Sequence, residues 1–530
     1  MSTHLPILPV LLPLLAGALL LLMRESGHGA RALLAVLATL AQLGVALLLV
    51  AGTPGSPDTP TSAGIRVYAL GGWPAPFGIV LVVDRLAGFM LSLTAILGLA
   101  AMIYALARWE RAGSHFLPLF QFLLMGLNGA FLTGDLFNLF VFFEILLAAS
   151  YGLALHGSGR MRVRAGLHYI VINLVASLVF LIAAALIYGL TGTLNMAEVA
   201  QRMPQLDADL RGLFDLAVFL LGLVFLVKAA AWPLNFWLPA TYAAAAAPVG
   251  GVFALLTKVG IYGLLRISTL FGQDAAPAPF QGEWLFHFGL ITLAVASLGV
   301  LSVQKLDRLA GFMILLSSGL LLAAFGFSGT RLTGPGLYYL ASSVLGGGAL
   351  FMLVELAERN RVPGNDFLAV SAEAFGLPDG EESPLAEETA GVAIPAAMAF
   401  LGLAFITCAV VLAGLPPFSG FVAKFALLRA ALMTPGPQAW LFFAALLLSG
   451  LAGLIALSRL GIRVFWDRER PVPRLQLLEA GPVAALLLLC MLLAFGAGPA
   501  LVWFETAATA LHDSGTYIRA VLPTDAGVPP

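Results

Sequence analysis

The chain has 530 residues, of which 60% are hydrophobic and 10% are charged, and its formal net charge is −1. Soluble domains carry about 25% charged residues, so the composition excludes a water-soluble protein, and the balanced charge gives no indication of nucleic-acid binding. The two cysteines, Cys408 and Cys490, lie in separate apolar stretches and indicate neither a disulfide framework nor a thiolate metal site.

The apolar stretches predict an all-α polytopic membrane protein with a single transmembrane domain, residues 1–530. A membrane span needs roughly 20 apolar residues, and about fourteen such segments can be placed. In chain order they run near 5–23, 32–52, 79–107, 115–133, 135–156, 165–190, 211–231, 247–270, 284–303, 309–329, 333–357, 391–412, 438–460 and 477–503. The first has no charged region before it and no clear cleavage site, so we expect it to be retained.

The positively charged residues predict the orientation of these spans. Most lie in loops that follow odd-numbered spans, at Arg24, Arg31, Arg108, Arg111, Arg160, Arg162, Arg164, Lys305, Arg308, Arg359, Arg361, Arg459, Arg463, Arg468, Arg470 and Arg474. The opposite loops hold mainly Arg66, Arg202, Arg211 and Arg331. Positive residues concentrate on the cytoplasmic side. We therefore expect the odd-numbered loops in the cytoplasm, both termini outside it, and the protein in the inner (plasma) membrane of the cell.

Two long connections separate the predicted spans. Residues 53–78 are rich in proline and glycine and predict an external loop, whereas residues 358–390 predict an acidic cytoplasmic loop. The acidic loop is either a partner-docking element or a plain solvated connector. The tail after Trp503 is too short to form a domain, so we expect the membrane domain alone.

Four charged residues lie deep inside predicted spans: Glu144, Lys228, Lys258 and Lys424. A charge at the centre of a bilayer costs about 2.5–3.5 kcal/mol on insertion scales. Such residues are typical of ion pathways, although they also occur as snorkelling side chains or as static ion pairs between helices. The four positions therefore predict an ion-handling membrane protein.

The structural interpretation is favoured instead for charges near span ends. These are Arg266, Arg429 and the pair Asp84–Arg85. The histidines His156, His168 and His287 are likewise expected at the membrane interface and not in a relay.

Proline and glycine interrupt two spans beside buried lysines. Lys228 is followed by Pro233, and Lys424 is preceded by Pro416 and Pro417. Proline disrupts a helix around it, and backbone groups freed in this way survive only inside protein or beside water. The segments 233–243 and 419–433 are therefore predicted to continue broken helices seven and twelve.

The two breaks are five spans apart, which predicts a five-helix repeat. Interrupted helices at corresponding places of two halves indicate inverted repeats around a transport site near the bilayer midplane. We expect the first repeat at about residues 115–270 and the second at about residues 284–460. Prolines at 239 and 248 follow the first break and belong to the same pattern.

A buried glutamate and a buried lysine form a proton switch on chemical grounds. Burial disfavours the protonated form of lysine, and a nearby carboxylate favours it. We expect Lys228 to hold a proton while Glu144 is close, and to release it toward Lys258 when the pair opens. The expected intervening groups are the backbone at the break, Thr257, Tyr262 and ordered water.

Five sequence segments carry a resemblance to a known family. They are GDLFNLFVFFEILLAASYGL (134–153), LTGTLNMAEVA (190–200), LVKAAAWPLNFWLPATY (226–242), LTKVGIYGLLR (256–266) and AGLPPFSGFVAKF (413–425). Together they resemble the proton-conducting antiporter-like family shared by Mrp (Pha) cation/proton antiporters and respiratory complex I, over residues 79–466. GDLFNLFVFFE and SRLGIRVFW (458–466) are most similar to the D-type subunit of Mrp antiporters.

The resemblance implies a fourteen-helix fold with two inverted five-helix repeats and broken helices seven and twelve. It places the family's fifth-helix glutamate on Glu144, and its lysines of helices seven, eight and twelve on Lys228, Lys258 and Lys424. It also implies a hetero-oligomeric complex that couples proton entry to export of Na⁺ or K⁺. Ser342 stands where many relatives carry a histidine, so the path between Lys258 and Lys424 either runs through serines and water or is interrupted there.

Three functions follow as alternatives. The chain is a secondary antiporter subunit that carries protons, an antiporter-like subunit of a redox-driven pump such as complex I or a membrane-bound hydrogenase, or a scaffold whose charges only hold helices together. We expect no cofactor, no metal site and no enzymatic activity, because no phosphate-binding loop, metal-ligand spacing or nucleophile–base motif is present. The proton is the favoured cargo, since three cationic side chains would repel Na⁺. The sequence does not choose Na⁺ over K⁺.

Overall fold

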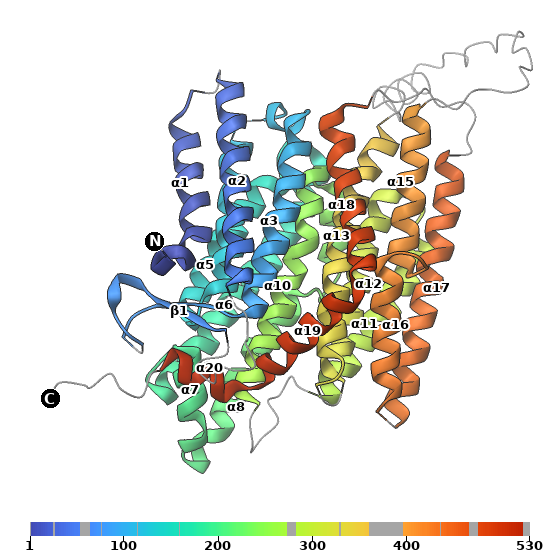
Figure 1. Ribbon diagram of the computed structural model, residues 1–530. Helices are drawn as coiled ribbons and strands as arrows, with labels where there is room; N and C mark the ends of the chain where they lie inside the picture. Colours follow the sequence, from blue (N-terminus) through green and yellow to red (C-terminus); the bar gives the residue numbers. More distant parts are fainter. Residues whose placement is uncertain are drawn as a thin grey trace, which may run out of the picture.

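The computed structural model describes residues 2–24, 27–52, 64–75, 77–113, 115–157, 159–272, 282–327, 330–359, 396–434, 436–465 and 475–522. Within these ranges, thirteen helices are long and apolar enough to cross a membrane, and a shorter apolar helix, Phe116–Leu132, adds to them. They stand side by side as one bundle (Figure 1). Each of the fourteen predicted spans overlaps one of these helices, which confirms the predicted fold class.

The long helices follow one another in the order of the predicted spans. They are α1 (Leu8–Leu22), α2 (His28–Ala51), α3 (Arg85–Leu106), α4 (Phe116–Leu132), α5 (Leu136–Ala154), α6 (Arg160–Thr191), α8 (Ala208–Lys228), α10 (Ala247–Phe271), α11 (Glu283–Ser302), α12 (Leu306–Gly326), α13 (Thr333–Glu358), α15 (Ala396–Ala413), α17 (Pro437–Phe465) and α18 (Leu477–Phe495). The short helices α9 (Trp237–Ala244) and α16 (Ser419–Leu432) continue α8 and α15 after breaks. Broken helices seven and twelve are thus present as predicted.

Three helices form the core of the bundle. In the most apolar stretch of α10, every residue is buried. The buried share is 94% in α13 and 89% in α12, but only 28% in α2. A helix that is apolar on all sides is typical of such a central position. Small residues bring α10 and α13 together: a Cβ at Gly251 would lie 3.4 Å from the Gly348 carbonyl oxygen. Close packing of this kind is what small residues allow in membrane helices.

The predicted span 79–107 begins too early. Residues Val80–Val83 form strand β2, which pairs antiparallel with β1 (Arg66–Ala69), so the predicted external loop contributes half of a hairpin. Helix α3 starts only after Asp84, whose carboxylate accepts a hydrogen bond from the Ala87 amide at 2.8 Å. The run of valines between residues 80 and 83 is as compatible with a buried strand as with a helix, and the N-cap sets the boundary. Residues 53–63 lie outside the described part.

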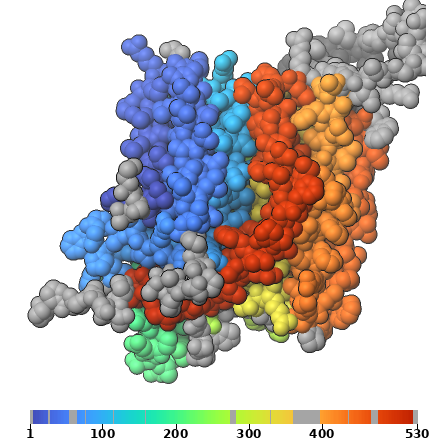
Figure 2. Space-filling view, in the orientation of Figure 1, coloured from blue at the N-terminus to red at the C-terminus, as the bar shows by residue number. Residues whose placement is uncertain are grey.

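The predicted last span, 477–503, is also too long. Helix α18 ends at Phe495, and a separate helix, α19 (Ala497–His512), runs obliquely across the bundle to the short helix α20 (Ser514–Val521). Figure 2 shows this segment lying over the outer surface of neighbouring helices. Contacts of α19 with α3, α10 and α13 hold it there, including a ring contact of 5.0 Å between Phe89 and Phe504.

The remaining described short elements are the helix α7 and four 3-10 turns. Helix α7 (Met196–Arg202) is capped by Asn195, whose side chain accepts hydrogen bonds from two amides of the first turn, and α20 packs on α7. The described 3-10 turns are η1 (Ser2–Ile7), η2 (Leu70–Gly72), η3 (Trp109–Arg111) and η4 (Met203–Gln205). Of the predicted acidic loop 358–390, only Glu358 and Arg359 are described, and the rest lies outside the described residues.

Candidate functional site

The first helix break begins where α8 ends, at Lys228. Ala230 adopts a left-handed conformation with φ 56°, and the amide of Ala231 donates to the Leu226 carbonyl oxygen at 2.9 Å. This is the hydrogen-bond pattern of a Schellman cap. It satisfies a carbonyl that the interrupted helix would otherwise leave without a partner. The next amide, of Trp232, donates at 2.9 Å to the Thr292 hydroxyl on α11.

Only one of the three prolines after Lys228 lies in this break. Pro233 follows a cis peptide bond between the two half-helices. Pro239 and Pro248 lie in the first turns of α9 and α10, where a missing amide costs little. The break is packed tightly, because a Cβ at Gly260 on α10 would overlap the end of α8.

The second break repeats this backbone arrangement. Helix α15 ends at Ala413, Gly414 has φ 82°, and the Leu415 amide donates to the Val410 carbonyl oxygen at 2.9 Å. In each break the left-handed residue is thus followed by the same six-residue hydrogen bond. The peptide bond between Pro416 and Pro417 is cis, as is the corresponding bond of the first break.

Lys228 and Glu144 lie on neighbouring helices without contacting each other. The Lys228 ammonium is 4.7 Å from the centroid of the Phe143 ring, which is a cation–π contact. The Glu144 carboxylate accepts a short hydrogen bond from the Ser177 hydroxyl on α6. Among the described residues Lys228 makes no ion pair. Glu144 and Lys228 therefore form no ion pair in this structure, and each is held by a neutral group.

Lys258 is completely buried at the centre of α10. Its ammonium donates to the hydroxyls of Ser317, at 2.5 Å, and Ser318, at 3.3 Å, on α12. The two side chains that were predicted to connect Lys228 with Lys258 bond backbone carbonyls instead. Thr257 donates weakly to its own helix, and the Tyr262 hydroxyl donates to the Phe131 carbonyl oxygen.

Lys424 lies on α16, beyond the second break, but its side chain reaches back across it. The ammonium donates to the carbonyl oxygens of Ala413, at 2.7 Å, and Leu412, at 3.1 Å. A cation at the C-terminal end of a helix is favourable because the last carbonyls lack partners and carry the negative end of the helix dipole. At the start of α16, the Ser419 and Ser342 hydroxyls are hydrogen-bonded at 2.8 Å. Ser342, which the sequence marks as a departure from the family, thus pairs with a second serine.

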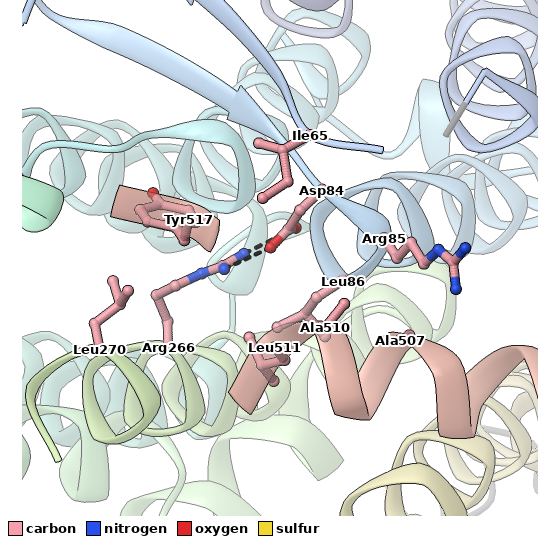
Figure 3. Close-up of a pocket in the computed structure, with 10 residues that line it drawn as sticks. All are labelled: Ile65, Asp84, Arg85, Leu86, Arg266, Leu270, Ala507, Ala510, Leu511 and Tyr517. Carbon is pink, nitrogen blue, oxygen red and sulfur yellow. Dashed lines mark hydrogen bonds and ion pairs between the residues drawn. The ribbon is translucent and has the colours of Figure 1, made fainter. Parts of the chain in front are cut away.

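Unlike the three lysines, which have neutral partners, Arg266 near a span end is paired with a carboxylate. Arg266 forms a two-bond ion pair with Asp84, at 2.5 and 2.9 Å, and Tyr517 of α20 lies over its guanidinium, 5.3 Å from the ring centroid. Figure 3 shows this pair beside a small cavity of about 10 Å³. The sequence groups Asp84 with Arg85, but the structure pairs Asp84 with Arg266, whereas Arg85 points away from this pair (Figure 3). Arg429 is exposed.

The histidines at the helix ends do not approach the four relay positions. His156 lies in the turn after α5, and its Nε2 donates to the Trp109 carbonyl oxygen at 2.9 Å. Burial lowers the pKa of His156, so its ring is neutral near pH 7. His168 and His287 each bond a carbonyl of their own helix. The three rings thus bond backbone carbonyls and none of the four charged residues.

The sequence prediction missed the hydroxyl groups that hold the charges. Ser177, Ser317 and Ser318 are the direct partners of Glu144 and Lys258. A serine in an apolar helix most often bonds its own backbone, so these three carry no distinctive signal. Helical spacing offers one signal, since Ser177 follows Tyr169 and Asn173 at intervals of four residues on α6.

Comparison with known proteins agrees with this geometry. The model of the family "NADH:quinone oxidoreductase/Mrp antiporter, TM" matches residues 133–451, which contain both breaks and all four charges. The chain is 50% identical over 534 residues to the D subunit of a probable K⁺/H⁺ antiporter of Rhizobium meliloti, covering 98% of this chain and 97% of the relative.

Two further proteins extend the comparison. The D subunit of a Na⁺/H⁺ antiporter of Alkalihalophilus pseudofirmus is 32% identical over 527 residues, covering 98% of this chain and 99% of the relative. A chain in the structure of the Mrp complex from Dietzia sp. superimposes with a TM-score of 0.80 at 27% identity, covering 98% and 99% of the two chains. From these matches, the chain belongs to the family of membrane subunits shared by NADH:quinone oxidoreductase and Mrp antiporters, and the relatives named above are antiporter subunits.

Proposed function

We propose that this chain is the proton-translocating subunit of a multi-subunit Na⁺(K⁺)/H⁺ antiporter, and that Glu144, Lys228, Lys258 and Lys424 carry the proton. One observation carries the proposal. Three buried ammonium groups have neutral partners, namely a ring face, two hydroxyls and two backbone carbonyls. A lysine held by neutral groups leaves no uncompensated carboxylate behind when it gives up its proton.

The contrast with the arginine sites supports this assignment. Arginine does not deprotonate in proteins, and Arg266 and Arg359 face carboxylates, those of Asp84 and Glu479. Those pairs suit helix packing, whereas a lysine at a helix break can change its protonation state. The proposed order is Glu144, Lys228, Lys258 and Lys424, and the Ser342–Ser419 hydrogen bond supports a route through serines between the last two.

The relatives supply the context for the proposal. Their printed names describe K⁺/H⁺ and Na⁺/H⁺ antiporter subunits, and the superimposed chain comes from an Mrp complex. We therefore place the chain in the plasma membrane, among other membrane subunits, with Na⁺ or K⁺ as the exchanged cation. The arginine-rich ends of the helices are proposed to face the cytoplasm, with both termini outside it. The matching backbone of the two breaks supports two inverted repeats at about residues 115–270 and 284–460.

Exchange assays on the complete complex test the relay. Glu144→Gln and Lys228→Ala are each expected to slow cation-dependent proton movement in everted vesicles by about 100-fold or more, the lower end of what a positioned proton-transfer group contributes. Arg429→Gln is the control, because it removes an exposed positive charge from the same helix as Lys424. Normal exchange by Glu144→Gln in a fully assembled complex would refute the relay, and loss of assembly with loss of exchange would favour the scaffold.

Co-purification separates the antiporter from a redox-driven pump. A tag on this chain is expected to recover small membrane subunits without flavin or iron–sulfur absorbance. Recovery of iron–sulfur proteins, with proton movement that depends on an electron donor, would assign the chain to the redox-driven alternative.

A further inference from the structure

Glu144 and Lys228 are bonded to different neutral groups although their helices are neighbours. The Ser177 hydroxyl on α6 donates a short hydrogen bond to the Glu144 carboxylate, and among the described residues no other group donates to that carboxylate. The Lys228 ammonium, at the end of α8, lies over the Phe143 ring of α5. The carboxylate is therefore held by a hydrogen bond, whereas the ammonium has only a ring face.

An aromatic wall surrounds the ammonium of Lys228. Phe143 contacts Phe180 at 5.9 Å and Phe225 at 6.1 Å, and the last two rings are 6.2 Å apart. All three rings are buried. A protonated lysine has three N–H donors, and the part of the chain that the structure describes gives this ammonium no oxygen acceptor. The nearby carboxylate is thus the group that would satisfy it best.

Only a short movement separates the two charges. Glu144 directly follows Phe143 in α5, so its side chain leaves the helix about 100° around the axis from the ring that carries Lys228. The two charged groups interact electrostatically without forming an ion pair. Because attraction between charges is stronger in an apolar interior than in water, a contact on the carboxylate side has to oppose pairing. Ser177 makes that contact.

The same face of α6 supplies the hydroxyl and part of the aromatic wall. Ser177 and Phe180 are three residues apart, which places them on one face of the helix. Ser177 is 5% exposed, so its hydroxyl is directed into the bundle and not toward the surface. Helix α6 therefore holds the carboxylate through one residue and supports the ring beneath the ammonium through the other.

We propose that Ser177 is a positioning residue that holds the Glu144 carboxylate away from Lys228. This inference rests on the proposed function and adds the group that keeps the pair apart. While the carboxylate is bonded to Ser177, Lys228 can release its proton: one N–H bond of the ammonium breaks, a neutral amine remains, and the proton passes toward Lys258, which accepts it as a neutral amine. While the carboxylate is paired with Lys228, the proton stays. Both arrangements have to be populated for the relay to turn over.

Two variants of Ser177 in the complete complex test this role. Ser177→Ala removes the hydroxyl, and Ser177→Cys keeps the size of the side chain but has only a weak S–H donor. In everted vesicles, each is expected to slow cation-driven proton exchange about tenfold, the equivalent of one hydrogen bond to a charged group. Ser449→Ala is the control, because it removes a buried hydroxyl that bonds only its own helix. Exchange by both Ser177 variants at the rate of the control would overturn the inference.

Infrared spectra of the same complexes distinguish positioning from a purely structural role. The carboxyl band that disappears in Glu144→Gln belongs to Glu144, and its frequency reports the donors of that group. Ser177→Ala is expected to shift this band by different amounts with Lys228 present and in a Lys228→Gln background, because only the ammonium can replace the lost hydroxyl as a charged donor. Equal shifts in the two backgrounds would show that Ser177 does not act on the pair, and would refute the proposed role.

The Glu144→Gln variant separates failure of this inference from failure of the proposed function. If Glu144→Gln abolishes exchange while both Ser177 variants match Ser449→Ala, Ser177 is not a positioning residue and the relay stands. If Glu144→Gln exchanges at the normal rate in an assembled complex, the proposed function fails, and the role of Ser177 in it fails as well.

Discussion

The two broken helices solve the same backbone problem but hold their lysines differently. In both, a left-handed residue and a six-residue hydrogen bond close the first half-helix. Lys228 precedes its break and lies on an aromatic ring, whereas Lys424 follows its break and is bonded to two carbonyls of the helix end. The break is therefore independent of which side the lysine occupies. The difference marks Lys228 as the loosely held charge and Lys424 as the firmly held one.

Neutralising the two lysines tests this difference with the largest expected effects. Lys228→Gln and Lys424→Gln are each expected to reduce exchange by about 100-fold or more. Only Lys424→Gln is expected also to destabilise the protein, by about 1–3 kcal/mol, because it leaves the Leu412 and Ala413 carbonyls without a charged donor. Thermal unfolding of the detergent-solubilised complex measures the second effect. Equal destabilisation by the two variants would remove the distinction between the breaks.

The hydroxyl partners of Lys258 test the link between the two breaks. The double variant Ser317→Ala/Ser318→Ala removes both acceptors of the buried ammonium, so the charged form of Lys258 is disfavoured. Exchange is expected to fall about tenfold, the equivalent of roughly one hydrogen bond to a charged group. Proton flux in vesicles provides the measurement, and Ser449→Ala, whose hydroxyl bonds only its own helix, is the control. Unchanged flux would mean that Lys258 does not depend on these serines.

Replacing the left-handed residue is expected to destabilise the second break but not the first. Gly414→Ala forces a side chain into φ 82° and against the Lys424 chain, so a loss of about 1–2 kcal/mol is expected from the conformation alone. Ala230→Gly relieves φ 56° but adds freedom to the unfolded chain, so it is expected to be neutral or to stabilise by less than about 1 kcal/mol. Unfolding temperatures of the two variants measured side by side decide this. Equal losses would show that the two caps are not equivalent.

The smallest effect is expected at the serine pair before the second break. Ser342→Ala removes its hydrogen bond to Ser419, and about a two- to fivefold slowing of exchange is expected because a single neutral hydrogen bond contributes about 1 kcal/mol or less. A loss as large as that of Lys424→Gln would instead make Ser342 an obligatory carrier. Initial rates at several cation concentrations distinguish these outcomes.

The fold was predictable wherever long apolar segments dictate it. Fourteen spans and two breaks follow from hydrophobic length and from prolines such as Pro233 and Pro417, because neither signal depends on tertiary contacts. The hairpin at Val80–Val83 and the oblique helix α19 did not follow. Both are apolar segments next to a span, and only packing against the bundle decides that they do not extend it.

The candidate site was predictable only as a set of charges. Glu144 and Lys258 are identified by the cost of burying them, whatever surrounds them. Their partners are not, because Ser177 and Ser317 look like any other serine of a membrane helix until the helices are assembled. Whether Glu144 and Lys228 touch is likewise a matter of side-chain arrangement, and here Phe143 takes the place of the carboxylate.

The oblique segment formed by α19 and α20 restricts how this protein can move. It starts at α18, crosses α13, α10 and α3, and ends beside α7 and β1, where Tyr517 covers Arg266. In a rocking-bundle cycle of alternating access, one half of the helix bundle would move past the other half. This movement would break the contacts of α19 and α20 at every turnover. Rotamer changes of a few lysine and tyrosine side chains leave them intact. The segment therefore favours transport by a static scaffold, in which only side chains and water move.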